Sequence, residues 1–89
     1  MPATVRHRGD PDVGAVILVH NRLRQGCVAY SRVSLESGGS GWLKATGDAP
    51  VGEADAESYI QRQIDRDPDT WVIEIEDRDG RFQLDAPVV

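Results

Sequence analysis

The stretch Asp67-Pro68-Asp69-Thr70-Trp71-Val72-Ile73-Glu74-Ile75-Glu76-Asp77-Arg78-Asp79-Gly80-Arg81-Phe82 decides the fold class of this chain. Pro68 disfavours a helical conformation at the residue before it, so a helix that precedes this stretch ends at Asp67. Residues 71–76 alternate between apolar and other side chains, which predicts a strand. Asp79-Gly80 predicts a tight turn. The stretch therefore predicts a helix end, a strand, a turn and the start of a return strand.

Two registers of the expected hairpin can be compared. A two-residue loop pairs Asp77 with Phe82, whereas a four-residue loop pairs Ile75 with Phe82, Ile73 with Leu84 and Glu76 with Arg81. The longer loop places apolar residues beside apolar residues and joins opposite charges, so it is the register we expect. It turns Ile73, Ile75, Phe82 and Leu84 towards the helix and core, and Glu74 and Glu76 towards water.

The rest of the chain predicts three more strands and one helix. The strands are expected over residues 13–21, 27–35 and 42–46, and the helix over 52–66, where apolar residues recur at helical spacing (Ala56, Tyr59, Ile60 and Ile64). The order β-β-β-α-β-β predicts an α+β fold, an antiparallel sheet of about five strands with the helix on one face. We expect residues 1–89 to form one small domain, with residues 1–12 as either a flexible arm or an edge strand.

Composition excludes several classes of protein. One cysteine cannot form an internal disulfide, the first residues lack the apolar core of a signal peptide, and the longest apolar run, residues 15–19, cannot span a bilayer. These features predict a cytoplasmic protein with no membrane partner. The net charge is −5. Residues 1–46 carry six basic and three acidic residues, and residues 47–89 carry four and twelve. This asymmetry fits a basic partner or self-association, and it equally fits the solvated faces of one folded body.

Three segments of the chain together resemble a known family. The chain combines Gly9-Asp10-Pro11-Asp12-Val13-Gly14-Ala15 with a helix over residues 54–63 and the stretch from Asp67 to Arg81. This pattern is similar to that of the bacterial domain-of-unknown-function family 1491. The resemblance covers about residues 8–84 and implies a bacterial cytoplasmic protein, but no activity, ligand or site residue. Met1 to His7 is shorter and more polar than the corresponding family segment, which indicates either a late start or a less protected sheet edge.

The acidic residues of the expected hairpin are the first candidate site. Glu74, Glu76 and Asp79, with Asp77 beside them, could hold Mg²⁺ or Ca²⁺ through carboxylate oxygens, and a metal-dependent hydrolase would use the bound water. The segment lacks the nearby lysine or histidine that such nucleases use, and it does not match an EF-hand. The simpler interpretation is the polar face of an antiparallel hairpin, so we predict no metal, cofactor or catalytic residue.

His20 and Cys27 flank the first turn and are the candidates for a base and a nucleophile. No third group that would orient the histidine is evident in the sequence, and one cysteine with two histidines does not match a zinc motif. Packing of both residues is the simpler interpretation.

Five arginines in the first half could form a basic patch for RNA, with Tyr30 and Trp42 as stacking platforms (the arginines are Arg6, Arg8, Arg22, Arg24 and Arg32). The negative net charge and the absence of a nucleic-acid motif argue against this interpretation. The preferred hypothesis is a non-catalytic interaction module that binds a protein partner or forms a homodimer, because open sheet edges invite strand addition. A metal-dependent hydrolase and an RNA-binding module are the alternatives.

Overall fold

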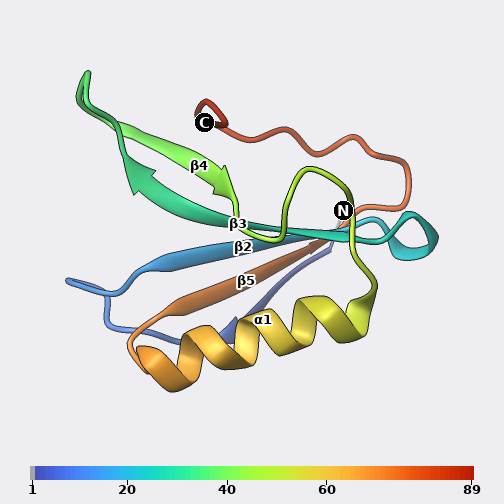
Figure 1. Cartoon of the computed structure of the whole chain (residues 1–89), viewed down its shortest axis with the longest axis horizontal. Helices are drawn as coiled ribbons and strands as arrows, with labels where there is room; N and C mark the ends of the chain where they lie inside the picture. The colour runs from blue at the N-terminus through green and yellow to red at the C-terminus, as the bar shows by residue number, and fades with distance from the viewer. Residues whose placement is uncertain (1) are drawn as a thin grey trace.

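The computed structural model describes residues 2–89 and contains five strands, one α-helix and one short 3₁₀ helix (Figure 1). Their order along the chain is β1 (Ala3–His7), β2 (Val16–Asn21), η1 (Leu23–Gln25), β3 (Cys27–Ser34), β4 (Ser40–Lys44), α1 (Glu53–Arg66) and β5 (Trp71–Glu76). The predicted helix and the strands of the first half are present, with bounds shifted by a few residues. The first twelve residues contribute an edge strand, β1.

The five strands form one sheet in the order β1-β5-β2-β3-β4. β5 pairs antiparallel with β1 and parallel with β2, and the remaining neighbours pair antiparallel. The α+β class, the five strands and the single helix are confirmed, but the expectation of a purely antiparallel sheet is wrong, because α1 serves as the crossover that parallel pairing requires. The element order is β-β-β-β-α-β.

The predicted return strand does not form. Residues 81–86 contain no strand, because both sides of β5 are already occupied by β1 and β2. The expected pairs of Ile75 with Phe82 and Ile73 with Leu84 are therefore wrong as backbone pairs. The four side chains nevertheless pack in the same apolar cluster, since the C-terminal segment crosses the sheet face instead of extending it.

Both faces of the sheet are covered, by α1 on one side and by the C-terminal segment on the other (Figure 1). Ala56 and Ile60 of α1 pack with Ile17, Val19, Cys27, Ala29 and Val72. On the other face lie Leu18, Tyr30 and Trp42, packed against Ile73, Ile75, Phe82 and Leu84. The prediction that Ile73 and Ile75 face the helix is thus wrong: Val72 and Glu74 face it.

Two of the three segments that carry the family resemblance, residues 9–15 and 67–81, touch one another. Asp10 donates its backbone N–H to the carbonyl of Asp69 at 3.0 Å, and Trp71 donates its indole N–H to the carbonyl of Asp10 at 3.0 Å. A side chain at Gly9 would collide with the Asp69 carbonyl group, so only glycine permits this approach. These motifs therefore join the turn before β2 to the turn before β5, which explains them as structural features.

Candidate functional site

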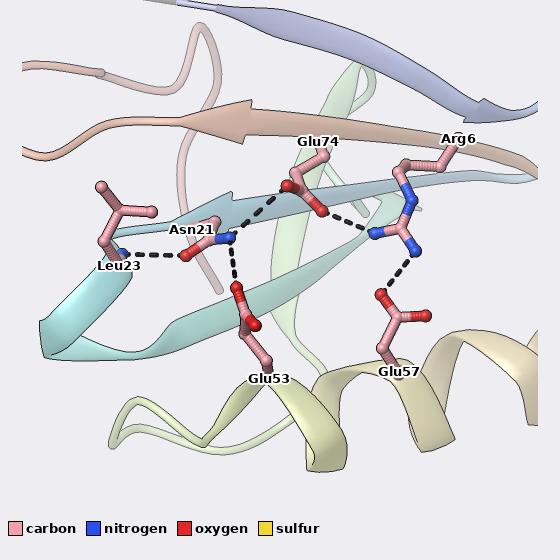
Figure 2. Close-up of polar contacts among 6 residues, drawn as sticks. All are labelled: Arg6, Asn21, Leu23, Glu53, Glu57 and Glu74. Carbon is pink, nitrogen blue, oxygen red and sulfur yellow. Dashed lines mark hydrogen bonds and ion pairs between the residues drawn. The ribbon is translucent and has the colours of Figure 1, made fainter.

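A polar network lies between the sheet and α1, around a cavity of about 170 Å³ (Figure 2). β1 contributes Arg6, β2 contributes Asn21 and β5 contributes Glu74, while Glu53 and Glu57 come from the first two turns of α1. The residues belong to four elements that are distant in sequence. Their contacts therefore link β1, β2, β5 and α1 to one another.

Arg6 joins three elements. Its guanidinium donates to Glu74 at 2.6 Å and to Glu57 at 2.5 Å. The hydrogen bond to Glu57 is the largest cause that raises the pKa of Arg6; burial opposes it, and the bond to Glu74 adds to it. This side chain fastens the edge strand β1 to both β5 and α1.

Asn21 is 4% exposed and uses both ends of its amide. Its NH₂ group donates to Glu53 at 3.3 Å and to Glu74 at 3.4 Å, and its oxygen accepts the backbone N–H of Leu23 at 2.8 Å. Leu23 has a φ of 58°, a left-handed conformation that is unfavourable for a residue with a Cβ. Asn21 thus stabilises a strained turn between β2 and β3.

Cys27 borders the same cavity, where its side chain is buried. Burial raises its pKa, and the charges of Glu53, Glu74 and Glu57 raise it further. The alternative in which Cys27 pairs with His20 is not present, because adjacent residues of a strand point to opposite faces. Asn21 lies across from Cys27, and His20 lies on the other side of the sheet. Packing in the core accounts for Cys27.

His20 has a partner that the sequence did not reveal. It donates from Nε2 to Asp77 at 2.8 Å, and Asp77 also accepts the backbone N–H groups of Arg81 at 3.0 Å and Phe82 at 2.8 Å. Burial alone would raise the pKa of Asp77, but the hydrogen bonds from Phe82, His20 and Arg81 outweigh it and lower the pKa. Asp77 therefore fixes the start of the C-terminal segment that covers the sheet.

The acidic candidates are separated by the fold. Glu74 is held by Arg6 and Asn21 on the helix side, whereas Glu76 and Asp79 border an open surface cavity with Arg78 and Arg81. Within residues 2–89, no group of three or more potential ligands is placed to hold a metal ion. No observation on these residues favours hydrolysis.

The arginines of the first half do not form one basic patch. Arg6 is paired with two glutamates, Arg8 lies 6.0 Å from the Trp71 ring and Arg32 donates to Ser40. Tyr30 and Trp42, the expected stacking platforms, are each only 9% exposed. Arg22 and Arg24 lie apart from the others, at a cavity that Arg78 also borders.

The sequence did not reveal the roles of Arg6, Asn21 and Asp77, although Arg6 and Asp77 were candidates for other sites. Only Asp77 carried a local signal, since an aspartate that precedes a turn often accepts backbone N–H groups of that turn. The glutamate partners of Arg6 and Asn21 are 32 to 68 residues away, and only the fold brings them together.

Comparisons with known proteins agree on one family. The family described as "Protein of unknown function (DUF1491)" matches residues 1–85. A crystal structure of a DUF1491 family protein from Caulobacter crescentus is 36% identical, with a TM-score of 0.82 over 98% of this chain and 80% of that chain. An NMR structure of a family protein from the same organism gives 36% identity and a TM-score of 0.77 over 98% of this chain and 78% of that one.

A solution structure of a protein from A. tumefaciens shares the fold, at 19% identity and a TM-score of 0.65 over 83% of this chain and 68% of that one. No curated protein matches the chain. No helix among residues 2–89 is long and apolar enough to cross a membrane.

Proposed function

Since the chain belongs to the DUF1491 family, for which no function is known, we propose from its own structure that it is a non-catalytic interaction module. Its partner adds an extended strand to the outer edge of β1. The observation that carries the proposal is the difference between the two edges of the sheet.

One edge is covered by the protein's own C-terminal segment. Trp42 of β4 donates its backbone N–H to Pro87 at 2.8 Å and accepts that of Val89 at 2.8 Å, in a parallel bridge with Val88. The opposite edge strand, β1, pairs with β5 on its inner side and has no neighbouring strand among residues 2–89 on its outer side. An uncovered edge offers unpaired N–H and C=O groups to another chain.

The unpaired groups of β1 can be assigned. Glu76 donates its N–H to Pro2, so the Pro2–Glu76 position is a hydrogen-bonded one, and positions alternate along an antiparallel pair. Thr4 therefore directs its backbone groups towards β5. Ala3 and Val5 direct theirs outward, where a partner strand can bind them.

β1 is also held rigidly enough to serve as a template. The Arg6 contacts fix it to β5 and α1, and Val5 is 52% exposed beside the open edge. A preorganised strand loses little conformational freedom on binding.

A second copy of the chain is the partner to which we commit. In an antiparallel β1–β1 pair, Thr4 of one copy lies opposite Thr4 of the other, and Ala3 of each copy lies opposite Val5 of the other. This pairing makes about four backbone hydrogen bonds between the copies and places no like charges opposite one another. At about 0.5–1.5 kcal/mol for each bond, and with an interface far below the standard size, the dimer is weak, with a Kd of about 1 mM.

Replacing Val5 with proline tests this proposal. The Val5→Pro variant loses an outward N–H but no bond to β5, so folding is retained while association is lost. Val5→Thr keeps the N–H and is the matched control. Sedimentation velocity at protein concentrations from about 50 μM to about 1 mM should show a concentration-dependent dimer for the wild type and the control only. In ¹H–¹⁵N spectra of the same two proteins, the amide signals of Ala3 and Val5 should shift as the concentration rises.

A synthetic peptide of residues 2–8 provides an independent probe of the edge. It should shift the same two amide signals in the monomeric range. If the chain stays monomeric up to about 1 mM and the peptide leaves the β1 amides unchanged, the proposal is refuted.

A further inference from the structure

Three arginines meet at the turn between β2 and β3. Arg22, Arg24 and Arg78 line a cavity of about 440 Å³ together with Leu23 and Gln25, and no acidic side chain is part of that lining. The volume lies in the range of small-molecule sites. This cavity is separate from the β1 edge, so a ligand could occupy it whether or not a strand adds to β1.

Arg22 is held in place by the fold. Its backbone N–H donates to Gly26 at 2.9 Å, and its guanidinium lies against Gly80, where a Cβ would come within 2.7 Å of Cζ. The Arg22 guanidinium therefore packs directly against the backbone of the turn that contains Gly80.

The Nε atom of Arg22 is buried and has no hydrogen-bond partner within residues 2–89. Buried N–H groups are nearly always satisfied, so an unsatisfied one needs an explanation, and a bound ion or water is one that would supply the acceptor. The backbone N–H of Leu23 is already taken by Asn21, so the donors that face this cavity are side chains, the three arginines and the amide of Gln25.

The three arginines also lack counter-charges. The described ion pairs involve Arg6 and His20, and none involves Arg22, Arg24 or Arg78, although the chain has fifteen acidic residues. Guanidinium groups gathered without carboxylates bind oxyanions through paired N–H donors.

The surroundings limit the size of that anion. A neighbouring cavity shares Leu23 and Arg78 and is bordered by Glu76, Asp77 and Asp79. A polyanion such as RNA would pass these carboxylates and be repelled, whereas a compact anion occupies the arginine cavity alone.

We propose that Arg22, Arg24 and Arg78 form a binding site for a compact phosphate-type dianion, either free or as the terminal group of a small molecule. The probes are inorganic phosphate and pyrophosphate, added at constant ionic strength. NMR detection of the Arg22 Nε–H signal reports directly on the buried donor, and we expect a saturable shift.

Arg24→Gln and Arg78→Gln test the two exposed donors without disturbing the core. Because hydrogen bonds to charged groups are strong, each variant should weaken binding of pyrophosphate about tenfold. Arg62→Gln removes the same charge from the exposed surface of α1 and should change the Kd less than twofold.

Three results would overturn the site. The first is the absence of saturation up to about 50 mM phosphate, and the second is an equal loss of binding in Arg62→Gln. The third is an RNA oligonucleotide that binds more tightly than pyrophosphate with the same arginine dependence, since that would assign the surface to a polyanion.

Discussion

Replacing Arg6 with methionine should loosen β1 from the rest of the sheet. Methionine keeps an apolar stem but removes the charge that joins β1 to Glu57 of α1 and to Glu74 of β5. The Glu74 side chain is only 21% exposed, so it would keep a partly buried charge with Asn21 as its remaining donor.

The two ion pairs should contribute unequally. Glu57 is 53% exposed, so water and salt screen its pair with Arg6, and we expect a coupling of about 0.3 kcal/mol. The pair with Glu74 is less exposed and should contribute about 1 kcal/mol. The Arg6→Met variant should therefore lose about 1–2 kcal/mol, which lowers Tm by about 4–16 °C in a domain of this size.

Urea unfolding of the double-mutant cycles measures both couplings. The cycles combine Arg6→Met with Glu57→Gln and with Glu74→Gln, and Arg62→Met on the exposed surface of α1 is the matched control. In 1 M NaCl the Glu57 coupling should vanish while most of the Glu74 coupling remains. Hydrogen exchange should show faster exchange at the Thr4 amide, which points towards β5.

A Glu57 coupling equal to or larger than that of Glu74 would refute the reasoning from exposure. A total loss below about 0.3 kcal/mol would refute the view that Arg6 holds β1 in place. An unchanged Thr4 amide in a clearly destabilised variant would show that the loss arises elsewhere.

Two further predictions concern buried titratable groups. Because the fold lowers the pKa of Asp77, this residue contributes stability that is complete above the ordinary carboxyl pKa of about 4 and is lost as the pH falls below it. The Asp77→Asn variant should therefore be less stable than the wild type at pH 7. Its unfolding midpoint, followed by circular dichroism, should also change less between pH 5 and pH 2 than that of the wild type. Equal pH profiles of the two proteins would contradict this. Cys27, 2% exposed and with a raised pKa, should react with a thiol reagent at least about 100-fold more slowly in the native protein than in urea, and a native rate within tenfold of the unfolded one would contradict its burial.

Local patterns in the sequence were sufficient to predict most of the elements. The alternation at residues 71–76 predicted β5, and Pro68 with the stripe on residues 52–66 predicted α1 and its end. Position in the sheet was not predictable in this way. β5 was assigned to a hairpin because the Asp79-Gly80 turn is adjacent in sequence, yet both its sides are occupied by β1 and β2, which come from the first quarter of the chain.

The error over the two faces of β5 has a related cause. Alternation of Ile73 and Ile75 with Glu74 and Glu76 is typical of a strand with one face in water. Glu74 instead faces the helix, where Arg6 and Asn21 satisfy its charge, and the isoleucines face the C-terminal segment. A carboxylate can occupy such a position only with donors from other elements, and these donors cannot be identified from the spacing of residues along one strand.

The same features that leave β1 open limit what it can bind. The strand is five residues long, and its register with β5 shifts between Val5 and His7. A partner strand can therefore form regular backbone pairing only with Ala3 to Val5. Short edges and bulges of this kind discourage continuous strand pairing and aggregation. A partner that binds more tightly must therefore add side-chain contacts. It would place an apolar side chain beside the exposed Val5 on one face of the sheet and a polar side chain beside the Arg6–Glu57 pair on the other face. A segment that alternates in this way would bind more tightly than a second copy of β1, which places only alanine beside Val5.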